Sequence, residues 1–217
     1  HHYGEGWANN IKRLLLEKKW LDRPIHIISA NPHSVMNYLY AAAAIQKPDM
    51  DMEDLARELS MSANQAMRNK VRQYALKHGM YQIDDTSGTN ITMQIFDTLQ
   101  IDAATLPPEL QWDDAYVQQH QPLIFVMDYA FGEQAFETMD ELLKPYKHEK
   151  ERYELRVDSI SIMGKAGTLN GSKGDIMVPT AHIFEGTTDN YPIENDLSSA
   201  DFAGNGLQVM EGPMITV

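Results

Sequence analysis

Two short apolar segments, each followed by a loop and a helical pattern, limit the folds open to this chain. Leu123–Met127 is a continuous apolar run, which is typical of a strand buried on both faces of a parallel sheet. Ile25–Ser29 is a second β-rich run, and a helix is expected after it at about 33–46, with Asn31 as N-cap and Pro32 at the first helical position. The sequence therefore predicts an α/β fold with a mixed or mostly parallel sheet flanked by helices.

Composition excludes several classes of protein. The chain has 217 residues, of which 43% are hydrophobic and none is cysteine, and its formal net charge is −13. The apolar fraction argues against wholesale disorder, and the lack of cysteine excludes disulfides, thiol nucleophiles and zinc–thiolate sites. The longest nearly apolar run, Tyr38–Ile45, is far shorter than the roughly 20 residues of a membrane-spanning helix. We expect a cytoplasmic protein without a membrane partner, whose overall acidic field disfavours nucleic acid.

The two ends suggest that the chain belongs to a longer polypeptide. It begins at His1 without an initiator methionine or a recognisable signal peptide. It stops at Val217, within a segment that has a strand pattern and no turn or cap. We therefore expect further residues beyond this point.

Changes in pattern divide the chain into four segments. Residues 1–48 form a strand–loop–helix unit that we expect to pack on the main domain. Residues 49–96 have two amphipathic helical patterns and a hairpin pattern, which predicts a small helical, winged-helix-like insertion. Residues 97–121, with two adjacent prolines and polar runs, are expected to be a linker. Residues 122–217 are expected to form the main α/β domain, truncated at its C-terminus.

The second helix of the insertion is basic. It has four cationic residues and no acidic one: Arg68, Lys70, Arg72 and Lys77. Such a helix can contact the phosphates of DNA, so a DNA-binding regulator acting through residues 51–95 is one hypothesis. The net charge of −13 and the lack of a basic arm favour instead a structural role or an interface between subunits.

Three motifs follow one another after residue 122. Residues 130–135 read Ala-Phe-Gly-Glu-Gln-Ala, residues 163–169 read Met-Gly-Lys-Ala-Gly-Thr-Leu, and residues 174–178 read Gly-Asp-Ile-Met-Val. In this order the motifs resemble those of the nucleoside phosphorylase and nucleosidase superfamily, and within it the AMP nucleosidase type, over about residues 122–217. The segment 211–217 is placed like the family strand that precedes the base-binding loop.

The resemblance implies hydrolysis of the N-glycosidic bond of a purine nucleoside or nucleotide through an oxocarbenium-like transition state. It implies a homo-oligomer and no cofactor. The family's catalytic acid and its ribose-binding glutamate would lie beyond Val217, so no catalytic residue is assigned. We expect the substrate to be bound at residues that lie in the motifs or follow strand ends: Asp128, Gly132, Lys165, Ala166, Gly167 and Glu185.

Three residues depart from the family pattern. Ala130 stands at the first glycine of the loop, Ile162 at the arginine of phosphorolytic members, and Lys165 at the family serine. Water is therefore favoured over phosphate as the nucleophile. The same departures leave open a catalytically degenerate protein that binds or senses a nucleotide without cleaving it.

Several candidate residues also have a plain structural interpretation. Gly132 suits a tight turn, and Asp128 suits a loop cap. Lys165 is a candidate phosphate-binding residue, because it supplies the positive charge that Ile162 cannot; its plain interpretation is an ordinary surface lysine. His33 and Ser34 lie at a helix start, where capping is the simpler role and phosphate binding the alternative. A pair of histidines at the chain start does not make a metal site, so no metal is expected.

Overall fold

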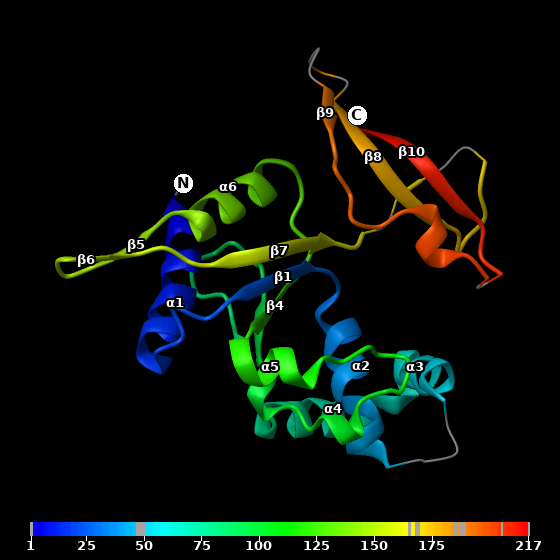
Figure 1. Cartoon of the computed structure of the whole chain (residues 1–217), viewed down its shortest axis with the longest axis horizontal. Coiled ribbons are helices and arrows are strands. Elements are labelled where there is room, and N and C mark those ends of the chain that lie inside the picture. Colours follow the sequence, from blue (N-terminus) through cyan, green and yellow to red (C-terminus); the bar gives the residue numbers. More distant parts are fainter. Residues whose placement is uncertain are drawn as a thin grey trace. The chain divides into compact units, whose positions relative to one another are not determined.

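The chain folds into two compact units, His1–Gly164 and Lys165–Val217. The computed structural model describes residues 2–46, 51–164, 166–167, 170–184, 186, 190–204 and 206–216. Figure 1 shows the elements of both units. The predicted α/β class is confirmed, because helices flank a mixed central sheet in the first unit.

Within the described part of the first unit, the central sheet has five strands in the order β2-β3-β4-β1-β7. In chain order the strands are β1 (Ile25–Ser29), β2 (Met80–Ile83), β3 (Met93–Asp97), β4 (Leu123–Met127) and β7 (Val157–Ile162). β1 pairs in parallel with both β4 and β7. β3 pairs antiparallel with β4 and with β2, so an antiparallel hairpin extends the parallel half.

Alternation along the strands separates two apolar cores, one on each face of the sheet. On one face Ile27 and Phe125 pack with α1 (His2–Lys18) and α6 (Gly132–Leu143). On the other face Val126 and Phe96 pack with α2 (Pro32–Ile45), α3 (Met52–Ser60) and α4 (Gln65–Lys77). Figure 1 shows α6 on one side of β1 and β7, and α2 with α4 on the other.

The hairpin of residues 49–96 belongs to the main sheet. The predicted helices and strands are present as α3, the short 3₁₀ turn η1 (Ser62–Asn64), α4, β2 and β3. β3, however, runs against β4 from Met93↔Met127 to Asp97↔Leu123, and all of its residues are buried. A strand covered on both faces lies in the interior of a sheet. The predicted winged-helix-like insertion is therefore not separate, because its hairpin completes the central sheet.

Residues 97–121 carry short elements instead of a bare linker. These are η2 (Thr98–Gln100), η3 (Ala103–Thr105) and α5 (Asp114–His120). Asp97 anchors their start, because it accepts hydrogen bonds from Arg23 at 2.6 Å and from Gln100 Nε2 at 2.7 Å. The Arg23 and Asp97 side chains are 11% and 8% exposed, so removing either one would leave a buried charge without its partner.

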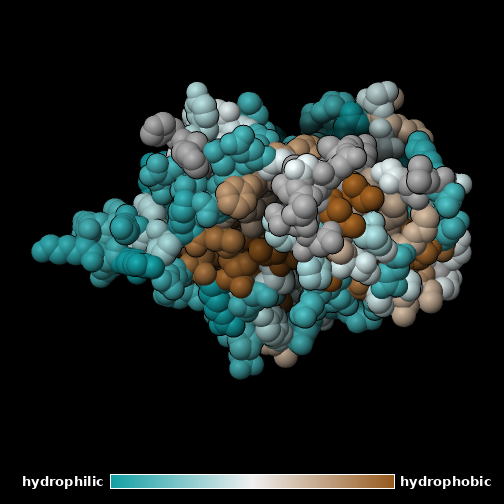
Figure 2. Space-filling view, turned by 90° about the horizontal axis from the view of Figure 1, so that it is seen from above, coloured by the Kyte–Doolittle hydropathy of each residue, from teal (hydrophilic) through white to brown (hydrophobic). Residues whose placement is uncertain are grey.

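A charged hairpin projects from the first unit between α6 and β7. Its strands are β5 (Tyr146–His148) and β6 (Glu151–Tyr153). In Figure 2 it is the teal projection at the left, and brown apolar surface lies beside its base. The following strand β7 exposes Ile160 and Ile162, so this edge of the sheet presents apolar side chains.

The second unit is built on a three-stranded sheet. β8 (Ile176–Phe184) pairs antiparallel with β9 (Asn190–Pro192) and in parallel with β10 (Val209–Thr216), and the short η4 (Ser199–Phe202) precedes β10. Residues 122–217 were expected to form one domain. The structure divides them at Gly164, because β4 and β7 pair with β1, whereas β8 pairs with β9 and β10.

Lys12 joins α1 to the end of α6. Its side chain is buried, and Nζ donates to the carbonyl oxygens of Glu141 at 2.6 Å and Lys144 at 2.7 Å. Desolvation by burial lowers the pKa of Lys12 to about 8, although the charge of Glu141 raises it. The folded protein therefore releases this proton more easily than the unfolded chain does.

The lowered pKa of Lys12 predicts a rise in stability with pH. Between pH 8 and 10.5 the unfolded chain holds more protons at this site than the folded chain, so the free energy of unfolding increases. We expect wild type to gain at most roughly 3 kcal/mol relative to Lys12→Met across this window. Urea unfolding at several pH values measures the difference. Lys18→Met, on the exposed side of the same helix, is the control, and an equal slope for both variants would contradict the prediction.

Candidate functional site

The carboxyl ends of β1 and β4 lie side by side in the central sheet. The chain leaves β1 toward α2 on one face, and it leaves β4 toward α6 on the opposite face. In open α/β sheets a crevice forms between two such neighbouring strands, and ligands bind there. The strand order thus marks this end of the sheet as the place for a binding site.

A pocket of about 380 Å³ occupies this place. Its volume lies within the roughly 300–1,000 Å³ that is typical of small-molecule sites. One wall comes from residues that follow the parallel strands, namely Asn31, Pro32 and His33 after β1 and Asp128 after β4. The other wall comes from α4 and the antiparallel hairpin: Arg72, Gln82, Thr92 and Gln94.

Gln94 is the buried polar residue of this pocket. It is 3% exposed, and its Oε1 has no hydrogen-bond partner. Met93 and Ile95 lie in the core beneath α1 and α6, so Gln94 points to the opposite face, which α2 and α4 cover. A buried acceptor left unsatisfied costs about 1–3 kcal/mol. An N–H or O–H group of a ligand would satisfy it, and Gln94 is therefore the strongest sign of a ligand here.

Arg72 places a positive charge on the wall formed by α4. Its Nε donates to Gln82 Oε1 at 3.3 Å, and Gln82 Nε2 donates to Asp84 Oδ1 at 2.6 Å. This chain of hydrogen bonds fixes the orientation of the guanidinium. Arg72 is exposed, and its terminal nitrogens are able to donate to a phosphate or carboxylate in the pocket.

The start of α2 borders the pocket, but its first backbone donors are already used. Pro32 has no N–H, His33 N–H donates to Asn31 Oδ1 at 2.9 Å, and Ser34 N–H donates to the Asn31 carbonyl at 2.9 Å. Asn31 is thus the N-cap, as predicted. An anion here would meet the positive end of the helix dipole and the His33 imidazole. Ser34, the other predicted phosphate residue, does not line the pocket.

The structure places Asp128 in the pocket, directly after β4. Its Oδ1 accepts a hydrogen bond from the Tyr129 N–H at 2.8 Å, and its own N–H donates to the Thr92 carbonyl at 3.0 Å. Asp128 therefore caps the loop and also presents a half-buried carboxylate to the pocket. Such a group accepts hydrogen bonds from sugar hydroxyls or from N–H groups.

Gly132 opens α6 and does not line this pocket. Its φ of 55° lies in the left-handed region, which favours glycine. A Cβ atom added there would meet no atom within 4 Å, so the turn alone accounts for the glycine. Glu133 follows in the first turn, where a carboxylate complements the helix dipole.

The remaining predicted site residues belong to the second unit, Lys165–Val217. Ala166 and Gly167 are exposed residues of the second unit, and a Cβ at Gly167 would meet no atom within 4 Å. Lys165 and Glu185 lie outside the described residues. The pocket thus brings together two of the predicted residues, Asp128 and His33.

Four pocket residues were not predicted as ligand contacts: Arg72, Gln82, Thr92 and Gln94. The sequence places Arg72 on a basic helix, for which DNA binding is one hypothesis and a structural or interface role is favoured. One signal was available for Gln94, because it is the polar residue of an otherwise apolar run, Met93 to Phe96. A lone amide among buried strand residues indicates either a hydrogen-bond network or a ligand.

Arg68, which lies in α4 like Arg72, has a structural role. Its guanidinium donates to the carbonyl oxygens of Leu59 at 3.0 Å and Ser62 at 3.3 Å, and to Gln65 Oε1 at 2.7 Å. Arg68 therefore closes the C-terminal end of α3. This use of its charge lends no support to the hypothesis of DNA binding.

Two further features are absent from the part of the chain that the structure describes. No helix there is long and apolar enough to cross a membrane. No group of three His, Cys, Asp or Glu residues there is arranged to hold a metal ion.

Replacing Gln94 by methionine keeps the length of the side chain and removes the unpartnered amide oxygen. We expect Gln94→Met to stabilise the ligand-free protein by about 1–2 kcal/mol, measured by urea unfolding. Gln82→Met is the matched control, because the Gln82 amide bonds to Arg72 and Asp84 and its loss brings no gain. A stability loss of equal size in both variants would show that the Gln94 amide is already satisfied.

A family model matches most of the chain. It is described as "Family of unknown function (DUF6909)" and matches residues 52–217. No curated protein and no solved structure matches the chain. The matched range contains Arg72, Gln82, Thr92, Gln94 and Asp128, whereas Asn31, Pro32 and His33 precede it. Because the match spans α3 to β10, the chain belongs to the DUF6909 family of unknown function.

Proposed function

We propose that the pocket between β1 and β4 binds a phosphorylated ribose compound, such as a purine nucleoside monophosphate. One observation carries this proposal. The unpartnered Oε1 of Gln94 lies in a pocket at the carboxyl ends of β1 and β4, and the side chains of Arg72 and Asp128 line the same pocket. A cytoplasmic location fits such a ligand.

Each part of such a ligand has a matching group in the pocket. The phosphate suits Arg72, with support from His33 and the positive end of α2. The ribose hydroxyls suit Asp128, since a carboxylate after a strand holds ribose hydroxyls in dinucleotide-binding α/β folds. Gln94 Oε1 then accepts from a remaining hydroxyl or from an exocyclic amine of the base.

Calorimetric titration tests the proposal with three ligands that differ by one part: AMP, ribose 5-phosphate and adenosine. We expect AMP and ribose 5-phosphate to bind, and adenosine to bind at least tenfold more weakly because it lacks the phosphate. Arg72→Met should weaken AMP binding at least tenfold, a loss of about 1.4 kcal/mol or more.

The matched control is Lys70→Met. Lys70 is another exposed cation of α4, but it lies two residues earlier and thus on a different side of the helix. We expect it to leave the affinity for AMP unchanged. Equal losses in both variants would indicate a general charge effect, and no binding of either phosphorylated ligand by wild type would refute the proposal.

A second candidate is hydrolysis of the N-glycosidic bond of the bound purine nucleotide. The motifs at 130–135, 163–169 and 174–178 motivate it, and Asp128 offers the pocket a carboxylate able to orient a water molecule. Water would attack the anomeric carbon as the bond to the base nitrogen breaks, and the base nitrogen would take a proton.

Chromatographic detection of free adenine released from AMP tests this second function. We expect Asp128→Asn to reduce release at least a hundredfold while it changes AMP affinity less than tenfold. Tight AMP binding by wild type without any adenine release would leave the binding proposal standing and reject hydrolysis. Release that persists in Asp128→Asn would reject the role of this carboxylate.

A further inference from the structure

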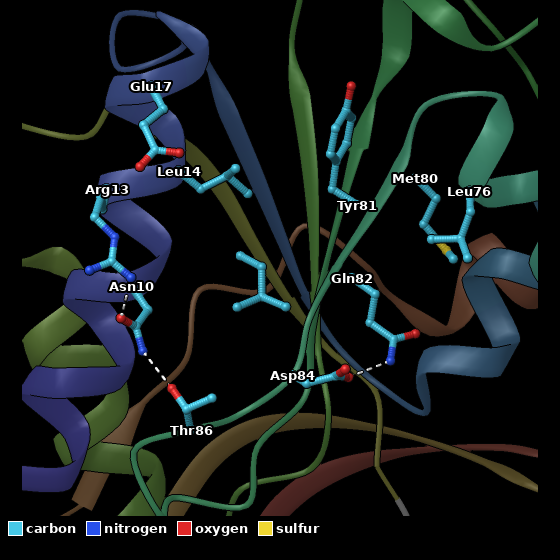
Figure 3. Close-up of a pocket in the computed structure, with 11 residues that line it drawn as sticks. Asn10, Arg13, Leu14, Glu17, Leu76, Met80, Tyr81, Gln82, Asp84 and Thr86 are labelled. Atoms are coloured by element: carbon cyan, nitrogen blue, oxygen red, sulfur yellow. Dashed lines mark hydrogen bonds between the residues drawn. The ribbon is translucent and has the colours of Figure 1, made fainter.

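Within the described residues, β2 and β7 are the two edge strands of the central sheet, and the free edge of β2 lies in a groove. The groove has a volume of about 590 Å³ and is lined by α1, by α4 and by the strand itself. Figure 3 shows Arg13 and Leu14 on one wall, Leu76 on the other, and β2 between them.

The backbone of β2 offers hydrogen bonds to this groove. The Asp97 N–H donates to the Gly79 carbonyl at 2.8 Å, which sets the phase of the antiparallel ladder between β2 and β3. Residues in such a ladder alternately direct their backbone groups toward the partner strand and away from it. Met80 and Gln82 therefore turn their N–H and C=O groups toward the free edge. Gln82 is half-buried and open to the groove, whereas Met80 is buried.

Apolar side chains line both walls of the groove, interspersed with polar ones. Tyr81 and Ile83 point toward α1, where they belong to the same core as Leu14. Met80 points to the other face, next to the exposed Leu76 of α4. An extended segment in the groove would thus meet apolar surface on both of its faces.

Charges at the two ends of the groove indicate what kind of segment fits. Glu17 lies near one end and Asp84 at the other, with Arg13 on the rim between them. Within the described part of the chain, none of these three side chains is in an ion pair. The whole chain also carries a net charge of −13, which attracts a basic partner and repels a second copy.

We propose that this groove binds an extended peptide of another protein by strand addition to β2, with an apolar centre and a basic residue at each end. Main-chain hydrogen bonds to Gln82 would supply part of the affinity, and the apolar side chains of the walls and the end carboxylates would supply the specificity. A second copy of β2 fits poorly, because α1 and α4 flank the edge and would meet their copies first. This inference does not depend on the proposed function of the pocket between β1 and β4.

Fluorescence anisotropy with a labelled probe tests the proposal on the full chain. The probe is acetyl-Lys-Val-Thr-Val-Val-Lys-amide, and its partner is the same peptide with N-methylated central residues, which lose their backbone donors. We expect the methylated peptide to bind at least tenfold more weakly. Equal affinity of the two peptides, or no binding of the first at millimolar protein in low salt, would overturn the proposal.

Two variants locate the binding site. Gln82→Pro removes an N–H that points to the free edge and spares the ladder with β3, so we expect at least a tenfold loss of probe affinity. Leu76→Ala should lose about threefold, whereas Leu143→Ala, a similarly exposed leucine on α6, should lose nothing. Binding that survives Gln82→Pro and Leu76→Ala would show non-specific attraction to an acidic chain and overturn the proposal. A dimer that Gln82→Pro dissociates would assign the edge to a second copy instead.

Discussion

The parallel pairing of β1 with both β4 and β7 governs the rest of the first unit. Parallel neighbours cannot be joined by a tight turn, so each connection has to cross a face of the sheet. The connection from β1 to β4 crosses with α2, α3 and α4, and the connection from β4 to β7 crosses with α6 on the other face. These crossings bury both faces of β4 and leave the crevice at the carboxyl ends, where the candidate site lies.

The sequence predicted which segments form the strands of this sheet better than it predicted which strands pair with one another. Leu123–Met127 and the strand–cap–helix at 25–46 were predictable because a fully apolar run and an Asn-Pro helix start are local signals. The place of β3 was not, since its pairing with β4 joins residues about thirty positions apart and leaves no local mark. The division at Gly164 was missed for the same reason, because it depends on which strands pair.

The candidate site was predictable only on its parallel-strand side. Asp128 and His33 follow strand ends, and this position alone indicates a ligand contact in an α/β fold. Arg72 and Gln94 reach the same pocket from α4 and β3, which the chain order separates from those ends. The sequence places Arg72 on a basic helix, but no local signal identifies the pocket beside that helix.

An acidic chain binds an anion only where a local cation outweighs the overall field. Here the amide of Gln82 separates the guanidinium of Arg72 from the carboxylate of Asp84, since it accepts from one and donates to the other. Among the described residues no ion pair joins Arg72 to a carboxylate, so its charge remains available to a ligand there. Gln82 thus leaves the guanidinium of Arg72 available to the proposed phosphate ligand, which the net charge of −13 would otherwise repel.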